Sequence, residues 1–282
     1  MAVVRRPKAE VKAAKAGDKG KSDRPDFGLT RFPPDPRLPK GYLSVSSARM
    51  FLKCPRQFEF RYVKGLIVPP GLALVEGVAH HAALEHDNKH RIERGKQVSS
   101  KVLTQLFSET FVKKSKDIDD WEGDNEKSVL LRGALLLKRW EQVSGWLQPT
   151  SAESKFEELI GGAPFLGFID VLTAKEVWDF KVVGRAKSEA DAKNDLQLQA
   201  YSLVTGKRKA GFVSLVKNAT KPESMVQKVQ VTVSDEDRAN AATVFGSVAD
   251  AIRKGSFPHT DPANWWCSPR FCGYYRLCKG GK

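Results

Sequence analysis

The chain has 282 residues, of which 41% are hydrophobic and 28% are charged. This apolar fraction is enough for a sizeable core and excludes a wholly disordered chain. The formal net charge of +14 at pH 7 favours a polyanionic partner, with nucleic acid first and an acidic membrane surface second.

Two features of the sequence bear on its cellular location. It has no apolar run of about 18 residues, so we expect no transmembrane helix. Its N-terminal segment lacks the apolar core of a signal peptide. We therefore expect a cytoplasmic protein whose four cysteines stay reduced and do not form a disulfide scaffold.

Residues 1–40 differ in composition from the rest of the chain. They hold eleven basic and five acidic side chains, a net charge of +6, with few large apolar residues. This composition predicts a disordered basic arm. Contact with phosphate groups and a purely solubilising role are both consistent with it.

Helices are predicted to dominate the first half of the remaining chain. The hydroxyl groups of residues 44–47 are typical of a helix start, and Pro55 is expected to bend or restart that helix. Further helices are predicted over residues 75–92, about 101–116 and about 125–147.

The hydrophobic period then changes to that of strands. Residues 152–182 alternate and contain a glycine pair at 161–162, which predicts two or three strands. A helix over residues 187–205, two further strands and a last helix over about 234–254 complete the pattern. The order of these elements predicts an α/β domain with helical additions.

The clearest chemical signal is the sequence from Asp170 to Lys181. A two-residue turn at 174–175 pairs Asp170 with Asp179 and places Lys181 two residues further along the same face. The opposite face is then apolar and suited to a core, with Ile169, Val171, Trp178 and Phe180.

Two carboxylates directly opposite each other repel, and a divalent cation with oxygen ligands would offset that repulsion. Around Mg²⁺ or Mn²⁺ the set Asp170, Asp179 and Lys181 suits phosphodiester hydrolysis. The metal polarises the phosphoryl oxygen and lowers the pKa of a bound water, while the lysine orients that water or stabilises negative charge. The hairpin alone also allows a solvated, mixed-charge turn that binds no metal.

These residues resemble the active-site signature of the PD-(D/E)XK nucleases, and the RecB-type and Cas4-type exonucleases, including those of bacteriophages, are the nearest look-alikes. GVAHH at 77–81 resembles the G-x-x-x-H element, and QLQAY at 197–201 resembles the Q-x-x-x-Y element. Residues 43–55 resemble the N-terminal helix-and-cysteine element. The motifs occur in the family's order over about residues 43–278.

The resemblance implies a restriction-endonuclease-like α/β core, a mixed central sheet flanked by helices. It implies that residues 41–282 form the nuclease domain, with N-terminal helical additions and a helical insertion at about 95–148. The Cys-rich segment at 256–282 would then be a cluster-binding tail.

The resemblance also implies a set of metal ligands. Asp170, Asp179 and the backbone carbonyl of Phe180 would bind Mg²⁺ or Mn²⁺, and His81 would complete the site with a nitrogen ligand. The neighbouring His80 points elsewhere on a helix, so we interpret it as structural or exposed.

The remaining catalytic roles follow the same resemblance. Lys181 would activate or position the water, while Gln197 and Tyr201 would steady the lysine and contact the phosphate backbone. Gln197 and Tyr201 are four residues apart, so one helix face can present both. An additional acid could come from the preceding strand, with Glu157 as the candidate and Glu153 and Glu158 as competitors, although a solvent-facing side chain is the favoured interpretation for any one of them.

The four cysteines form a second pattern. Three of them, Cys267, Cys272 and Cys278, lie close together near the C-terminus, and Cys54 precedes the proposed core. The arrangement resembles the iron–sulfur staple of Cas4-type nucleases, although the first spacing here is four residues rather than two. A [4Fe–4S] cluster is the first interpretation, structural Zn²⁺ the second and four unrelated buried thiols the third. The nearby aromatic residues could shield a cluster from water: Trp265, Trp266, Phe271, Tyr274 and Tyr275.

These patterns together favour a metal-dependent DNA exonuclease acting in recombination, repair or DNA processing. The expected substrate is DNA, as single-stranded or duplex ends, in a bacterial or phage-infected cell, and no membrane is involved. A helicase, recombination or single-strand-annealing protein is a possible partner. The alternatives are a non-catalytic nucleic-acid-binding module with a structural zinc or iron–sulfur site, and a Cas4-like trimming nuclease in CRISPR adaptation.

Overall fold

The computed structural model describes residues 12–13, 31–118 and 120–279, so most of the predicted basic arm at 1–40 lies outside the described residues. The chain divides into two compact units. Unit 1 comprises residues 1–69, 157–167 and 242–282, and unit 2 comprises residues 70–156 and 168–241.

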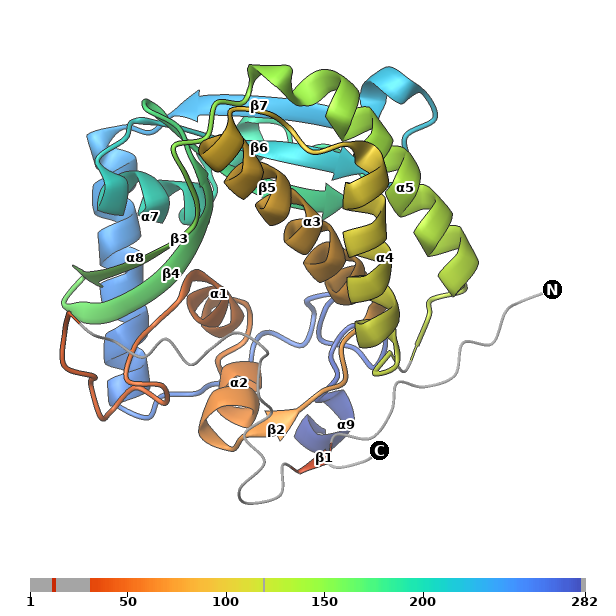
Figure 1. Ribbon diagram of the computed structural model, residues 1–282. Coiled ribbons are helices and arrows are strands. Elements are labelled where there is room, and N and C mark those ends of the chain that lie inside the picture. The colour runs from red at the N-terminus through yellow and green to blue at the C-terminus, as the bar shows by residue number, and fades with distance from the viewer. Residues whose placement is uncertain (1–11, 14–30, 119, 280–282) are drawn as a thin grey trace. The chain divides into compact units, whose positions relative to one another are not determined.

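The order of the elements follows the predicted succession of helices and strands (Figure 1). The helices are α1 (Val45–Lys53), α2 (Pro55–Phe58), the π-helical turn Glu59–Val63, α3 (Leu72–Arg94), α4 (Ser100–Ser115), α5 (Glu126–Val143), α6 (Glu189–Lys193), α7 (Leu196–Thr205), α8 (Asp235–Arg253) and α9 (Tyr275–Cys278), with short 3₁₀ turns at Ser144–Trp146 and Pro222–Ser224. The strands are β1 (Lys12–Ala13), β2 (Leu66–Ile67), β3 (Ser151–Ile160), β4 (Ala163–Leu172), β5 (Glu176–Val183), β6 (Lys209–Val216) and β7 (Val226–Thr232).

The main sheet has five strands in the order β3-β4-β5-β6-β7. Strand β5 pairs antiparallel with β4 and parallel with β6, and β7 pairs antiparallel with β6. The parallel pair requires a crossover connection, which α6 and α7 supply. The predicted α/β class, a mixed central sheet flanked by helices, is therefore confirmed.

The predicted helix start and break in unit 1 are also confirmed. The hydroxyl of Ser44 accepts the Ser47 N–H at 3.3 Å, and the hydroxyl of Ser47 accepts the Ser44 N–H at 2.9 Å. This reciprocal cap satisfies amides that the first turn leaves without helical partners. Helix α1 ends at Lys53, and Pro55 is the first residue of α2, where its missing N–H costs nothing.

The single helix predicted over 187–205 is wrong, because the structure has two. Helix α6 ends at Lys193, and the Asp195 carboxylate accepts the N–H groups of Gln197 and Leu198 at 2.9 and 3.3 Å. A new N-terminal cap therefore starts α7 within the predicted segment. This cap fixes the position of Gln197 in the first turn of α7.

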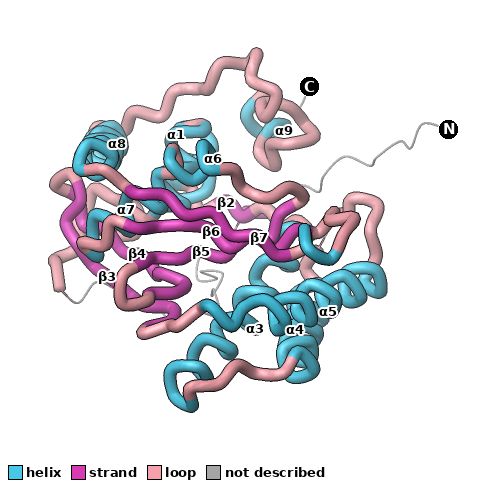
Figure 2. The backbone as a smooth tube through the Cα atoms, turned by 90° about the horizontal axis from the view of Figure 1, so that it is seen from above, coloured by secondary structure: helices cyan, strands magenta, loops and turns pink. Residues whose placement is uncertain are grey.

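The core of unit 2 lies between the strands and the helices α3, α4 and α5, which Figure 2 shows together on one side of β5, β6 and β7. Gly133 of α5 is needed for their close approach, since a Cβ atom there would lie 2.2 Å from the Phe107 ring of α4. The buried Asp87 of α3 accepts the Trp140 indole N–H of α5 at 2.8 Å and the Val98 N–H at 2.8 Å. These contacts fix α3, which carries His81.

Candidate active site

The β4–β5 hairpin has the register that the sequence predicts next to its turn. Val171 pairs with Trp178, and Leu172 pairs with Val177. Among the described residues the ladder between these strands ends there, so the expected pairing of the two aspartates is not part of it. Instead, the carboxylate of Asp170 accepts the backbone N–H of Phe180 at 2.7 Å. A side chain thus replaces a backbone acceptor where the two strands separate.

The two faces of β5 carry different chemistry. Trp178 and Phe180 belong to the apolar cluster with α3, α4 and α5, and alternation places Asp179 and Lys181 on the other face. That face is not open to solvent. Asp179 is only 2% exposed and Asp170 only 9%, which excludes a solvated hairpin and requires polar partners for both carboxylates.

The partners of Asp179 come from its own strand and from α7. The Lys181 ammonium lies 2.5 Å from Asp179 Oδ2 and donates to the Gln197 Oε1 atom at 3.0 Å. The Gln197 amide donates to Asp179 Oδ1 and to the Tyr201 hydroxyl, both at 2.7 Å. Tyr201 in turn donates to the Phe168 carbonyl at 2.7 Å. These residues form one connected network, so the lysine is held in position before any substrate arrives.

A second group of ligands lies around His81 of α3. Its Nδ1 atom lies 3.4 Å from Asp170 Oδ1, and its Nε2 atom lies 3.1 Å from the Phe180 carbonyl oxygen. His81, Glu153 and Asp170 can each offer a ligand atom within 4.8 Å of the others. One nitrogen and two carboxylate ligands at this spacing suit a divalent cation such as Mn²⁺ or Mg²⁺.

Glu153, rather than Glu157, is therefore the additional acid near the site. The carboxylate of Glu157 accepts the Arg31 N–H at 2.8 Å, and Glu158 forms an ion pair with the Arg31 guanidinium. Glu153 has a φ of 47° within β3, a left-handed conformation that is costly for a residue with a side chain. The sequence places Glu153 only among the competing candidates, because a strand-like pattern does not show the left-handed backbone at this position.

The charges of the site shift one another's titration. Burial raises the pKa of Asp179 to about 6, although Lys181 opposes this change. Burial also lowers the pKa of His81, but the adjacent Asp170 carboxylate outweighs it and raises that pKa to about 9. Burial raises the pKa of Asp170, but the positive charge of His81 and the Phe180 N–H bond bring it below its usual value. Without a metal, the His81 imidazolium thus supplies the positive charge that Asp170 needs.

His80 is structural, and it is not exposed. It is fully buried against Phe107, with ring centroids 4.4 Å apart, and its Nδ1 atom lies 2.9 Å from the Glu76 carbonyl oxygen. Burial lowers the pKa of His80 to about 4, so this imidazole is neutral at pH 7. The two neighbouring histidines therefore differ in charge as well as in direction.

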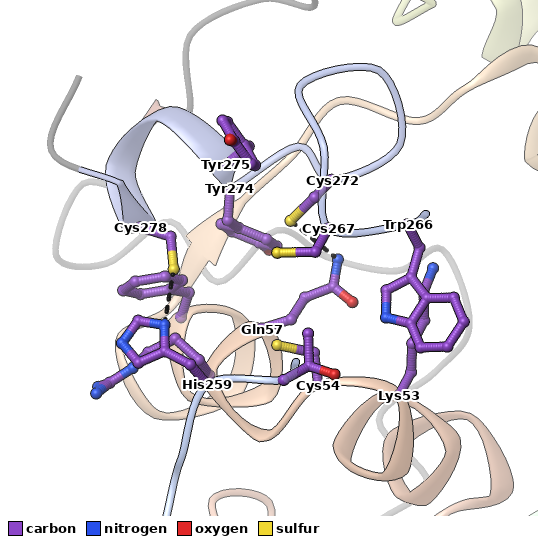
Figure 3. A pocket seen from close by; sticks show the side chains of 13 residues that line it. Lys53, Cys54, Gln57, His259, Trp266, Cys267, Cys272, Tyr274, Tyr275 and Cys278 are labelled. Carbon is purple, nitrogen blue, oxygen red and sulfur yellow. Dashed lines mark hydrogen bonds between the residues drawn. The ribbon is translucent and has the colours of Figure 1, made fainter. Parts of the chain in front are cut away.

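The four cysteines line a single pocket in unit 1 (Figure 3). All four are half-buried and free, and no three of the described cysteine sulfurs lie within 4.8 Å of one another. Their polar neighbours are His259, whose Nδ1 atom lies 3.3 Å from Cys278 Sγ, and Gln57, whose amide donates to Cys272 Sγ at 3.9 Å. Burial raises the pKa of both the Cys272 and Cys278 thiols, so their thiolates would require a compensating cation.

The aromatic residues around this pocket do not act alike. Trp266, Tyr274 and Tyr275 line it, as a shield would. Trp265 and Phe271 do not line it and are 66% and 43% exposed. The prediction that all five aromatic residues shield the pocket is therefore wrong for these two.

A membrane-spanning helix was not expected from the sequence. In the part of the chain that the structure describes, no helix combines the length and apolar character needed to cross a bilayer.

The chain is similar to known nucleases in sequence and in fold. The sequence profile of the PD-(D/E)XK nuclease superfamily matches residues 42–279, while no curated protein matches the chain. A solved structure from Eubacterium rectale, provisionally described as an exonuclease, is similar with a TM-score of 0.56 and 14% identity, over 80% of this chain and 86% of that one. The structure of SSO0001 has a TM-score of 0.37 and 14% identity, over 72% of this chain and 86% of that one. At 14% identity, the similarity to the first structure shows the fold alone.

Proposed function

Because the chain belongs to the PD-(D/E)XK nuclease superfamily, we propose that it is a metal-dependent DNA exonuclease that hydrolyses phosphodiester bonds. The observation that carries this proposal is the network of Asp179, Lys181 and Gln197 beside the ligand group of His81, Glu153 and Asp170. A binding module would not need two buried aspartates, because burying carboxylates is costly unless each has a charged or hydrogen-bonded partner.

The metal ligands in this proposal are His81, Asp170, Asp179 and the Phe180 carbonyl. Glu153 is added because its ligand atom lies within 4.8 Å of those of His81 and Asp170. Oxygen and imidazole donors fit Mg²⁺ and Mn²⁺, which would polarise a phosphoryl oxygen and lower the pKa of a bound water. The His81 ring already lies between Asp170 and the Phe180 carbonyl. It must give up its proton before it can act as a nitrogen ligand.

Lys181 has the central role in the proposed reaction. Its ammonium is held between Asp179 Oδ2 and Gln197 Oε1, so its position is set without substrate. From there it orients the attacking water and stabilises the negative charge that grows on the phosphoryl oxygens as the P–O bond breaks. Gln197 and Tyr201 act as positioning residues in this scheme, because they hold Lys181 and Asp179 in place.

The cysteine pocket is proposed to hold a [4Fe–4S] cluster through Cys54, Cys267, Cys272 and Cys278. Four thiols that line one pocket suit a thiolate-bound metal group. Zn²⁺ with Zn–S bonds of about 2.3 Å would draw tetrahedral sulfurs to roughly 4 Å of one another. No three described cysteine sulfurs lie within 4.8 Å, which favours the larger cluster over a single zinc ion. Such a group would tie α1 to the C-terminal segment of unit 1.

The biological setting is proposed on the resemblance to RecB-type and Cas4-type enzymes. The enzyme would act on DNA ends in the cytoplasm of a bacterial or phage-infected cell, during recombination, repair or DNA processing. A helicase or strand-annealing protein is a suitable partner, since such enzymes act on ends that other proteins expose.

A nuclease assay on anaerobically purified protein tests the proposed activity. End-labelled linear DNA and closed circular DNA are incubated with Mg²⁺, Mn²⁺ or EDTA, with Asp179→Ala as the control. We expect metal-dependent loss of linear DNA alone, and none with the variant. Binding without cleavage under every condition would instead favour the non-catalytic module, and cleavage of the closed circle would contradict an exclusive exonuclease.

A further inference from the structure

The Cys-rich segment presents an aromatic pair on its surface that the proposed active site does not use. Trp265 is 66% exposed and Phe271 is 43% exposed, and their rings meet edge to face with centroids 4.8 Å apart. Single exposed apolar residues are common. Two large aromatic rings in contact, both at the surface, form a larger apolar feature that a binding partner would cover.

Neighbouring groups fix the orientation of this pair. Trp266, which lines the cysteine pocket, contacts the Trp265 ring with centroids 5.7 Å apart and planes at 82°. The Ser268 hydroxyl donates to the Trp265 carbonyl at 3.0 Å, and the Phe271 N–H donates to the Ser268 carbonyl at 3.1 Å. The exposed rings are therefore held before any ligand arrives, which reduces the entropy lost on binding.

The charge around the pair is positive. The Arg270 guanidinium lies 5.1 Å from the centre of the Phe271 ring and is exposed. Residues 256–279 carry three basic side chains and one acidic side chain. A cation against an aromatic ring, in a segment with excess positive charge, suits a ligand that combines flat rings with phosphate groups.

We propose that Trp265 and Phe271 form a stacking platform for unpaired bases of single-stranded DNA, with Arg270 contacting the adjacent phosphate. Single-stranded DNA is favoured over duplex because its bases expose the π-faces that an indole ring can cover. The inference rests on the proposed function, since it assigns a substrate-binding surface to the same enzyme. It adds a base-binding site in unit 1.

Equilibrium binding to labelled oligonucleotides tests the platform. The protein carries Asp179→Ala so that DNA is not cut, and the probes are a thymidine oligonucleotide and an abasic oligonucleotide of equal length. We expect Trp265→Ala to weaken binding to the thymidine probe roughly 5- to 150-fold, the range for losing one stacked base. Binding to the abasic probe should stay within twofold, because it offers phosphates but no bases.

Two further variants separate stacking from damage to the segment. Trp265→Phe keeps an aromatic face and should recover most of the affinity for the thymidine probe. Leu277→Ala removes another exposed side chain of the same segment, 50% exposed and without a π-face, and should leave both affinities unchanged.

The outcomes distinguish this inference from the proposed function. If the wild-type chain cleaves DNA but Trp265→Ala binds both probes like its parent, the platform is wrong and the nuclease stands. An equal loss on both probes, or an equal loss on blunt duplex, also overturns the assignment to unpaired bases. If the parent binds no single-stranded probe and the wild-type chain cuts no DNA, both proposals fail.

Discussion

The carboxylate site of unit 2 and the cysteine pocket of unit 1 differ in how far their polar groups satisfy one another without a metal. In unit 2 the polar groups satisfy one another, since Lys181, Gln197 and His81 supply the positive charge and hydrogen bonds that the two aspartates need. In unit 1 the cysteine sulfurs have weaker polar contacts, from His259 to Cys278 at 3.3 Å, from Gln57 to Cys272 at 3.9 Å and from the Tyr274 backbone to Cys272, since sulfur is a weak acceptor.

This difference separates what each metal group would do. The carboxylate site can keep its shape without a cation, so removing the cation should stop the reaction while the fold persists. The polar contacts to the sulfurs of the cysteine pocket are weaker, so removing a bound metal group should weaken the fold of unit 1. Each of the following predictions tests one side of this comparison.

The largest expected effect is on cleavage by the Lys181→Ala protein. We expect its rate to fall by about 10³-fold, the loss typical of removing a group that stabilises transition-state charge. DNA binding should remain close to wild type, while the thermal midpoint should fall, because the buried Asp179 carboxylate loses its ion-pair partner and keeps only its α7 contact with Gln197. The control is Lys175→Ala, in the nearby turn. Cleavage within threefold of wild type would remove Lys181 from the mechanism.

The second-largest expected effect is a loss of stability in the Cys272→Ser protein. We expect this change to lower the free energy of unfolding by about 4 kcal/mol, because the loss of a metal group is among the most destabilising single changes. The visible absorbance of the anaerobically purified protein and its thermal midpoint should fall together, whereas Lys181→Ala should leave the absorbance unchanged. A colourless, metal-free wild type that is as stable as the variant would contradict the cluster.

A smaller effect is expected from Glu153→Gln, which keeps the size of the side chain and removes its charge. The concentration of Mn²⁺ needed for half-maximal cleavage should rise by about 10-fold, within the range seen when a group near a metal is altered. Glu158→Gln, on the same strand, should leave the metal requirement unchanged because Glu158 pairs with Arg31. An equal metal requirement for both variants would remove Glu153 from the site.

The sequence predicts much of this arrangement, and the failures have physical causes. Period and turn chemistry locate the helices, the strands and the Val171–Trp178 register, because alternation and capping are local properties. Burial of the hairpin's polar face is not local, since it depends on α3 and α7 packing against β5. The sequence favours Glu157 over Glu153, because the left-handed backbone at Glu153 has no signature in a strand-like sequence.

The cysteine pattern shows a similar limit. Spacing alone brings together Cys267, Cys272 and Cys278, and the structure places them with Cys54 around one pocket. Spacing in the sequence does not show which flanking aromatic residue faces that pocket. Trp265 and Trp266 are adjacent, so their distances from the cysteines along the chain hardly differ. Their opposite exposure is a property of the folded segment.

The last prediction concerns the pH dependence of metal binding at the carboxylate site. In the metal-free site the pKa of His81 is about 9 and that of Asp179 about 6, and both must be deprotonated to act as ligands. Between pH 9 and pH 6 one proton, from His81, competes with the metal, so affinity should fall by about tenfold for each unit that the pH falls. Below pH 6 the proton on Asp179 competes as well, and the decline should steepen.

Titration calorimetry of Mn²⁺ into the wild-type protein, in the absence of DNA, would measure this dependence in buffers from pH 6 to pH 9. His81→Gln removes the first proton and should flatten the curve above pH 6 while lowering the affinity at pH 9. A wild-type-like slope in that variant would mean that another group carries the proton. If the affinity of the wild-type protein for Mn²⁺ does not change between pH 7 and pH 9, His81 does not bind the metal. The site would then depend on carboxylates alone.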